Sequence, residues 1–287
     1  MKSPFKLFPP GVAYRRPRQN VAATMKYIVL RDNFGLLTWI ALGAVLQGLA
    51  SLVSPRYALL PAAAFIAQRM LRTMFMYLGI VRNPAMDEVL PGKFAVQIPG
   101  RDGSPPTKPA EEDITVIILA SRSNHPLGAL APGYGKLVGY IGNMISELSR
   151  ENEKHGFLGC TGWTALTEQR SGNQVMVVCY FRTLEDLHGF AHGPLHRKAW
   201  DWWNGITKAH PHLSIMHEVY HAPKGHWENI FINNHLTGIA NTVSRVNVEG
   251  KKIRPLFSGN LGGMRSQLGR LGRGNGEENV DFDVDYK

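Results

Sequence analysis

Asp113–Ala120 reads DITVIILA, a short and nearly continuous apolar run that is typical of a strand buried on both faces. After it, Tyr134–Glu153 carries apolar residues at the three- and four-residue spacing of an amphipathic helix. Phe157–Leu166 and Gln174–Phe181 return to strand-like patterns. The Ser-Gly-Asn that ends the intervening Thr167–Asn173 predicts a hairpin turn between them.

A second helical region and a last strand follow the hairpin. Thr183-Leu-Glu-Asp begins the helix as a variant capping box, with Asp in place of the usual Glu. Pro194 interrupts the pattern and suits the first turn of a further helix, which continues to about Ala209. His212–His221 has the composition of a strand, and Glu228–Asn233 adds a short extension. The order is β-α-β-β-α-β, so we predict an α+β fold of the ferredoxin-like type.

A ferredoxin-like sheet carries its helices on one face only. Its other face needs a cover, commonly a second copy of the same sheet, so we predict a homodimer. We assign residues 113–245 to this domain. Residues 83–112, which are rich in Pro, Gly and Lys, are predicted to be a linker. Residues 246–287 are rich in Gly and Arg and then acidic, and we predict a disordered tail.

Two apolar runs precede the domain. Gly35–Val53 (GLLTWIALGAVLQGLASLV) has nineteen residues and no charge. At a rise of about 1.5 Å per residue it approaches the hydrocarbon thickness of a bilayer, about 30 Å. Tyr57–Val81 is also apolar but contains Arg69 and Arg72, so it either crosses the membrane or lies in the interface. We therefore expect residues 35–82 to form a membrane hairpin, or one span with an interfacial helix.

The positive charge of the chain is confined to its N-terminal part. Residues 1–82 hold 11 Lys/Arg and one acid, Asp32, whereas residues 83–287 hold 21 of each sign. A nucleic-acid-binding protein normally carries its basic face on the folded domain, so we expect no nucleic-acid partner. The positive-inside rule places the basic segment 1–34 in the cytosol. A hairpin then returns the chain, and we expect an endomembrane protein whose C-terminal domain faces the cytosol.

The segment Phe181–Gly205 (FRTLEDLHGFAHGPLHRKAWDWWNG) concentrates chemically active side chains. His188, His192 and His196 recur every four residues beside three tryptophans, and residues four apart share a helix face. No carboxylate completes an H-E-x-x-H pattern and no Cys lies near, so we predict no metal site. An imidazole here could ligate haem or serve as a base or hydrogen-bond donor. Alternatively, the histidines only cap helices or reach solvent.

Other candidates come from the strands. In the last strand, Glu218 and Tyr220 point to the face opposite His217. Trp163 lies on the second strand, and Asn124 follows the first. Large aromatic side chains around a cavity would suit an apolar, conjugated small-molecule substrate, although they also serve as core residues. Phosphate-loop, nicotinamide, flavin and Ser/His/Asp signatures are absent from the sequence. The two cysteines, Cys160 and Cys179, are expected to be buried, reduced thiols.

The stretch FRTLEDLHGFAHGPLHRKAWDWW (181–203), followed by IMHEVYHAPKGHWENIFINN (215–234), resembles the fungal monooxygenases of the fumagillin-pathway type. The resemblance covers about residues 90–240. It implies a dimeric α/β barrel of the antibiotic-biosynthesis-monooxygenase kind. It also implies O₂-dependent oxygen insertion or oxidative cleavage of polyketide or terpenoid intermediates of secondary metabolism. Relatives with this fold include cofactor-free oxygenases and haem-binding enzymes, so O₂ is the expected co-substrate and haem stays possible.

By position, the resemblance points to His192, His196 and Glu218 as catalytic residues, with His192 as the ligand if haem is used. Expected substrate-binding residues are Asn124, Trp163, His188, Trp200 and Tyr220. The membrane segment would then deliver the domain to a substrate dissolved in the bilayer. Two alternatives stay open at this point: a haem enzyme of another type, such as an aldoxime dehydratase, or a non-catalytic, membrane-tethered binding or dimerisation module.

Overall fold

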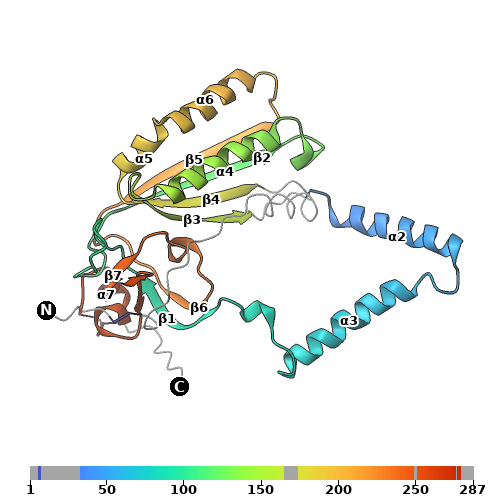
Figure 1. Cartoon of the computed structure of the whole chain (residues 1–287), viewed down its shortest axis with the longest axis horizontal. Helices are drawn as coiled ribbons and strands as arrows, with labels where there is room; N and C mark the ends of the chain where they lie inside the picture. The colour runs from blue at the N-terminus through green and yellow to red at the C-terminus, as the bar shows by residue number, and fades with distance from the viewer. Residues whose placement is uncertain (1–5, 8–32, 165–173, 249–250, 276, 279–287) are drawn as a thin grey trace.

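Figure 1 shows the chain as a computed structural model, which describes residues 6–7, 33–164, 174–248, 251–275 and 277–278. The hairpin turn predicted in Thr167–Asn173 lies outside the described residues, as does most of the basic segment 1–34.

A four-stranded antiparallel sheet with three helices forms the centre of the molecule. Its elements, in chain order, are β2 (Ile114–Ser123), α4 (Tyr134–Arg150), β3 (Phe157–Thr164), β4 (Val175–Phe181), α5 (Leu184–Ala191), α6 (Pro194–Ile206) and β5 (Leu213–Ala222). The spatial order is β3-β4-β2-β5, and every neighbouring pair is antiparallel. This is the ferredoxin-like arrangement, so the predicted α+β class and order of elements are confirmed.

The three helices lie on one face of this sheet (Figure 1). Ile145 and Leu148 of α4 and Phe190 of α5 pack with Phe181 of β4 in one buried cluster, which holds the helical layer on the sheet. Cys160 and Cys179 pair across β3 and β4 in the same cluster, and both are free, buried thiols, as expected. A side-chain hydrogen bond with Cys160 and burial raise the pKa of the Cys179 thiol well above its ordinary value.

The start of α5 shows half of the predicted capping box. The Thr183 hydroxyl accepts a hydrogen bond from the backbone N–H of Asp186, at 3.0 Å. The Asp186 carboxylate does not accept a hydrogen bond from the Thr183 backbone N–H. Instead, it forms an ion pair with Arg101, whose Nη2 lies 2.7 Å from Asp186 Oδ2. Asp is one methylene shorter than Glu, and this carboxylate is engaged by another part of the chain.

A second sheet, in the order β6-β1-β9, packs at one end of the first sheet's helix-free face. It consists of β1 (Leu90–Val96), β6 (Phe231–Asn234) and β9 (Leu256–Ser258). Phe94, Val96 and Leu256 are buried with Ile114 and Leu158 of the ferredoxin-like sheet. Two further short strands, β7 (Val246–Val248) and β8 (Lys251–Ile253), and the helix α7 (Gln267–Arg270) adjoin it. We call β1, β6, β7, β8, β9 and α7 together the cap.

The cap corrects two expectations. Residues 83–112 are not a linker throughout, because they contain the short helix η2 (Pro84–Met86) and the buried strand β1. Residues 246–287 are not a disordered tail throughout, because β7, β8, β9, η5 (Gly262–Arg265) and α7 fold within them. Both segments acquire apolar surroundings from each other and from the ferredoxin-like sheet, because Phe94 and Leu256 share one buried cluster with Ile114 and Leu158.

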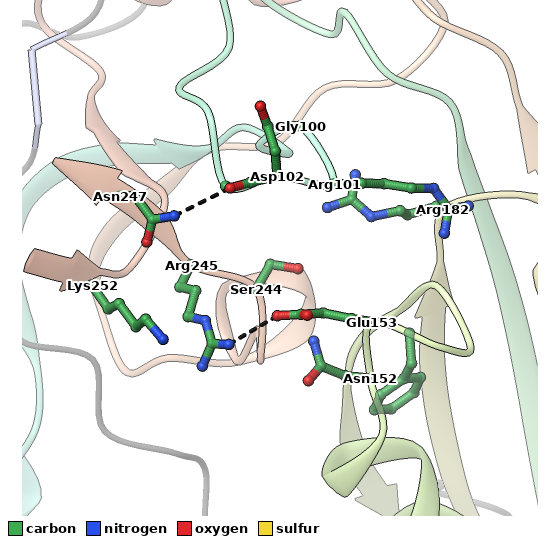
Figure 2. A pocket seen from close by; sticks show the side chains of 12 residues that line it. Gly100, Arg101, Asp102, Asn152, Glu153, Arg182, Ser244, Arg245, Asn247 and Lys252 are labelled. Carbon is green, nitrogen blue, oxygen red and sulfur yellow. Dashed lines mark hydrogen bonds and ion pairs between the residues drawn. The ribbon is translucent and has the colours of Figure 1, made fainter. Parts of the chain in front are cut away.

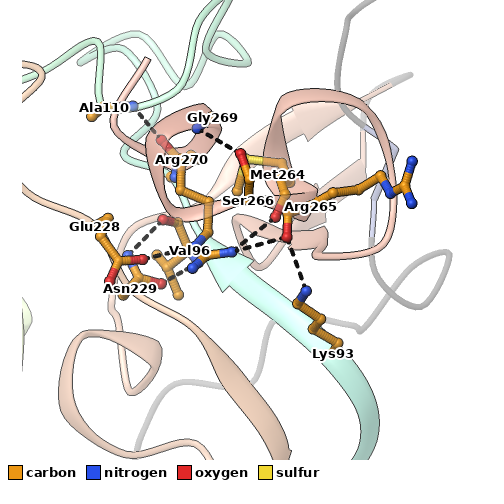
Figure 3. A network of polar contacts seen from close by, with 11 residues as sticks. Lys93, Val96, Ala110, Glu228, Asn229, Met264, Arg265, Ser266, Gly269 and Arg270 are labelled. Atoms are coloured by element: carbon orange, nitrogen blue, oxygen red, sulfur yellow. Dashed lines mark hydrogen bonds and ion pairs between the residues drawn. The ribbon is translucent and has the colours of Figure 1, made fainter. Parts of the chain in front are cut away.

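Buried charged side chains connect the strands of the cap to its C-terminal turn (Figure 3). Arg270 is 2% exposed, and its Nε donates to Glu228 Oε2 at 2.7 Å while its Nη1 donates to the Met264 carbonyl at 3.2 Å. Lys93 of β1 is fully buried and donates to the Arg265 carbonyl at 3.1 Å. One β1 side chain thus holds the C-terminal turn in place.

The two N-terminal helices, α2 (Leu36–Val53) and α3 (Leu60–Tyr77), project away from both sheets (Figure 1), and we call them the arm. No residue of either helix is buried. Within the described residues, one helix, α2, is long and apolar enough to cross a membrane by length and composition. Asn33, which is 4% exposed, ties the root of α2 to the domain: it donates to the Leu127 carbonyl and accepts from the Ala129 N–H.

Candidate functional site

The predicted site residues separate onto the two sides of the ferredoxin-like sheet. Ile117 of β2 packs into the helix-side cluster, and its partner on β5 is Val219. Because side chains alternate along a strand, His217 shares the helix side while Glu218 and Tyr220 face the other way. His188, His192, His196 and Trp200 belong to the helical layer. The sheet therefore does not bring Glu218 together with the helix histidines.

His192 ends α5. Its Nδ1 lies 2.8 Å from the carbonyl oxygen of His188, and both imidazoles are exposed. Their ring centroids are 6.5 Å apart. His192 therefore fulfils the local capping role that the sequence left open as an alternative, and its ring orientation is fixed by its own helix.

His196 is the imidazole with the environment of a base. It is partly buried on α6, with its ring 6.3 Å from that of Phe190. Burial lowers its pKa below the ordinary value; a hydrogen bond with the Ala191 backbone acts in the opposite direction, and the charges of His192 and His217 lower the pKa further. A histidine whose pKa is lowered is neutral at physiological pH and can accept a proton. Among the predicted site histidines, His196 is the one whose pKa is lowered.

Sequence reasoning placed His217 on the face of β5 opposite Glu218 but did not select His217 as a site residue. The structure brings it close enough to His196 to affect the pKa of that residue. It also reveals a contact farther along the same side of β5, where His221 Nδ1 lies 3.0 Å from Thr115 Oγ1 and its Nε2 lies 3.8 Å from Asp113 Oδ2. The spacing of histidines at 217 and 221 was the signal, because residues four apart in a strand share a face.

Glu218 and Tyr220 form a pair on the helix-free face. The Tyr220 hydroxyl donates to Glu218 Oε2 at 2.8 Å. This hydrogen bond and the carboxylate charge raise the pKa of Tyr220, because they favour the protonated phenol. Tyr220 is 56% exposed, so the pair is open to solvent or to a partner.

Trp163 stands on the same helix-free face, at the far edge of the sheet. The register sets Trp163 beside Met176, Met176 beside Ala120, and Ala120 beside Met216, so one apolar row crosses all four strands. Trp163 and Met216 are 44% and 36% exposed. The cap covers the other end of this face, at Val116 and Tyr180, whereas Trp163 and Met216 at the two ends of this row are exposed and Ala120 between them is buried.

The two remaining candidates lie apart from both groups. Asn124 follows β2, is exposed, and donates its backbone N–H to the His212 carbonyl at 2.7 Å. Trp200 on α6 is 52% exposed. Near Asn124 the centroid of the His212 ring lies 5.0 Å from that of His125 and 5.4 Å from that of His210. Within the part of the chain that the structure describes, no group of three His, Cys, Asp or Glu side chains is arranged to hold a metal ion.

Comparison with known proteins gives a family match and weaker structural likenesses. The family model described as "Monooxygenase af470-like" matches residues 114–239. Monooxygenase af470 of Aspergillus fumigatus is 31% identical over 264 residues, which cover 90% of this chain and 94% of that protein.

Two solved structures are similar to part of the chain, both with TM-scores below 0.5. SnoaB, a cofactor-independent oxygenase from Streptomyces nogalater (mutant N63A), is similar at 10% identity with a TM-score of 0.26, over 37% of this chain and 90% of its own. An aldoxime dehydratase is similar at 14% identity with a TM-score of 0.39, over 54% of this chain and 42% of its own.

Proposed function

The chain belongs to the monooxygenase af470-like family and is a monooxygenase, and from this premise we propose that it uses O₂ on an apolar polyketide or terpenoid intermediate at a membrane, with His196 as the base. Membership confirms the resemblance drawn from residues 181–203 and 215–234, and it sets aside the non-catalytic alternative. The reaction would be oxygen insertion at an activated carbon or oxidative cleavage, as a step of secondary-metabolite biosynthesis.

The single observation that carries the proposed site is the environment of His196. It is a partly buried imidazole whose pKa is lowered by burial and by two neighbouring histidines. A general base works best when it is unprotonated at the operating pH and its partial burial limits water around it. His217, on the facing strand, is the nearest candidate for a hydrogen-bond partner of the substrate.

A balanced step follows from this assignment. Neutral His196 takes a proton from an acidic C–H of the substrate, which leaves a carbanion at that carbon. The carbanion gives its electrons to O₂, and one oxygen atom stays on the carbon while the other leaves as water. For a methylene group that becomes a carbonyl group, the substrate supplies all the electrons and no external reductant is needed.

The arm supports a membrane location for this chemistry. Every residue of α2 from Leu36 to Val53 is unburied, and an exposed apolar helix of this length has no stable place in water. We propose that α2 enters an endomembrane, that α3 with its two arginines crosses it or lies at its surface, and that the C-terminal domain faces the cytosol. A lipophilic substrate would reach the domain from the bilayer.

The exposed ends of the apolar row on the helix-free face support a homodimer. Trp163 and Met216 are exposed at these two ends, and Tyr220 is exposed elsewhere on the same face. We propose that a second copy covers this row. Sedimentation of the detergent-solubilised full chain should show two copies, and Met216→Asp should shift it to one; a wild-type monomer would contradict the dimer.

A haem group bound through His192 fits this chain poorly. The contact of its Nδ1 with a backbone carbonyl suits a metal ligand, because it fixes the orientation of the ring. However, His192 is exposed, whereas a haem macrocycle needs apolar walls on its faces. We therefore assign no step to haem and do not extend the aldoxime dehydratase reading to this chain.

Metabolite profiles of the host with and without the protein, followed by turnover of the accumulating intermediate under ¹⁸O₂, test the reaction. One labelled oxygen in the product is expected. His196→Gln should lower kcat by about 10²–10⁴-fold, the usual contribution of a general base. Because the pKa of His196 is lowered, kcat/KM of the wild type should stay constant as the pH falls past the ordinary histidine pKa of about 6.5. It should decrease only at lower pH.

The matched control is His235→Gln, which removes an exposed imidazole outside the site and should leave turnover unchanged. If His196→Gln retained full turnover, His196 would not be the base. If the metabolite profiles with and without the protein were identical, the proposed place in biosynthesis would be wrong.

A further inference from the structure

A cavity of about 300 Å³ lies where the ferredoxin-like domain meets the cap (Figure 2). Its walls come from the turn at 100–103, the connection from α4 to β3, the end of β4, and the segment around β7 and β8. None of the predicted catalytic or substrate-binding residues lines it. Its volume falls at the lower end of the range of small-molecule sites, about 300–1,000 Å³.

The lining of this cavity is strongly cationic. Four cationic side chains face two carboxylates in the lining, those of Asp102 and Glu153, and a third carboxylate, Asp186, lies just outside it, which leaves a surplus of one positive charge. The cations are Arg101, Arg182, Arg245 and Lys252. Arg245 pairs with Glu153 at 2.8 Å, and Arg101 pairs at 2.7 Å with Asp186, which lies outside the lining.

Two of the cations are not neutralised by a direct ion pair. Arg182 donates Nη1 to the Pro99 carbonyl at 2.8 Å, and burial lowers its pKa, a sign that water solvates this guanidinium incompletely. Lys252 forms no hydrogen bond or ion pair with the residues that the structure describes, and Figure 2 shows its side chain directed toward the cavity. An anion in the cavity would supply the missing counter-charge for both.

The cavity wall is held in shape without a ligand. Asn247 donates Nδ2 to the Asp102 carbonyl at 3.2 Å and its backbone N–H to the Gly103 carbonyl at 2.9 Å. Gly103 has φ of +82°, and a Cβ there would lie 2.5 Å from Asn247 Nδ2, so the turn requires glycine. Ligand binding would therefore need little reorganisation of the turn.

We propose that this cavity binds the phosphate group of a small molecule, at a site separate from the oxygenation chemistry. A phosphate group offers more oxygen atoms than a carboxylate, so it can contact both Arg182 and Lys252, the two cations without a direct ion pair. Guanidinium groups bind phosphate oxygens through paired hydrogen bonds, and a lysine adds a point charge. In Figure 1, β7 and the beginning of β3 lie at the end of the molecule away from the arm, which favours a soluble phosphate ester over a lipid headgroup.

Isothermal titration of the full chain in detergent micelles with inorganic pyrophosphate, inorganic phosphate and acetate tests the proposal. One pyrophosphate or phosphate ion per chain is expected, with acetate much weaker and with affinity that falls as NaCl increases. Lys252→Gln should weaken phosphate binding about tenfold, which corresponds to about 1.4 kcal/mol. Arg182→Gln should weaken it further; because Arg182 is partly buried, its folding should be checked by circular dichroism.

Lys251→Gln is the matched control, because consecutive residues of β8 point to opposite sides and Lys251 does not line the cavity. It should leave phosphate binding unchanged. Equal weakening by both lysine variants would mean unspecific attraction and would overturn the site, as would the absence of binding. Flotation with vesicles that contain phosphatidic acid separates the sources: a loss with Lys252→Gln only would indicate a lipid phosphate, and no change would indicate a soluble one.

Discussion

The arm and the cap are both additions to the ferredoxin-like sheet, and they differ in whether their apolar side chains are exposed or buried. In the arm, leucines, phenylalanines and methionines of α2 and α3 are exposed along both helices, and no residue of either is buried. In the cap, Phe94, Leu256 and Phe257 are at most 2% exposed. The more apolar segment of the sequence is thus the exposed one, and the more polar segment forms a core.

This difference in burial indicates the environment that suits each part. Burial of apolar area stabilises a fold by about 25 cal/mol per Å² only if the alternative is contact with water. Side chains of the cap satisfy that condition by packing on the main sheet. Those of the arm do not, and contiguous exposed apolar surface of this extent marks a membrane or a partner. Under the proposed attachment to a membrane, the arm contributes location, whereas the cap contributes stability.

The largest expected effect comes from truncating one phenylalanine in each region. Phe94→Ala, in the cap, should lower the free energy of unfolding by about 3–5 kcal/mol, because it opens a cavity in a packed core. Phe65→Ala, in α3, removes a side chain that is 66% exposed and should change it by about 0.5 kcal/mol or less. Urea unfolding in detergent, followed by tryptophan fluorescence, measures both. Equal losses would mean that the arm is packed against protein.

A second pair of variants tests the buried charge of the cap. Arg270→Leu leaves Glu228 without its ion-pair partner and should destabilise the chain by about 3–5 kcal/mol. Arg273→Leu, three residues later and exposed, should have an effect within about 0.5 kcal/mol. The same unfolding assay measures both variants. A small effect of Arg270→Leu would show that the C-terminal turn contributes little to the fold.

These two regions also explain which parts of the fold could be predicted from the sequence. The central elements follow from local periodicity, as in α4, whose apolar residues repeat every three or four positions. The strand β1 does not: its residues LPGKFAV include Pro91 and Gly92, and its Lys93 is fully buried through a contact 172 positions away. A buried lysine contradicts every compositional expectation. The strand is stable only because the C-terminal turn, with its Arg265 carbonyl, folds against Lys93.

The site divides in the same way. The histidine spacing on α5 and α6 and the alternation along β5 were visible locally, and the alternation predicted that His217 and Glu218 point to opposite faces. The proximity of His196 to His217 was not visible, because it depends on how α6 packs across the edge strand. Grouping Glu218 with the helix histidines was therefore wrong, because Glu218 lies on the helix-free face of the sheet and the histidines lie in the helical layer on the other face.

A charge in the arm should affect location but not folding. Leu46 of α2 is 67% exposed, and Leu46→Arg places a cation near the middle of the apolar helix. Transfer of that helix into a bilayer should become less favourable by about 2.5–3.5 kcal/mol. Vesicle flotation should show reduced binding, with an unchanged urea midpoint in detergent. Leu261→Arg, near the cap, is the control and should float like the wild type; loss of folding by Leu46→Arg would contradict the division of roles.

The smallest expected effect lies at the seam between sheet and cap. Gly159 of β3 has φ of +144°, and a Cβ there would lie 2.7 Å from the Asn241 carbonyl oxygen. It also forms an isolated bridge with Thr242, so the edge of the ferredoxin-like sheet and the segment leading to the cap meet at this residue.

Gly159→Ala should destabilise the chain by about 1–3 kcal/mol through backbone strain and close contact. Gly162→Ala, three residues along the same strand, meets no atom closer than 4.0 Å and should be neutral or slightly stabilising. Urea unfolding of the two variants compares them directly. If they were equally stable, the cap would not depend on the close approach at Gly159, and its attachment would rest on the cluster around Phe94 alone.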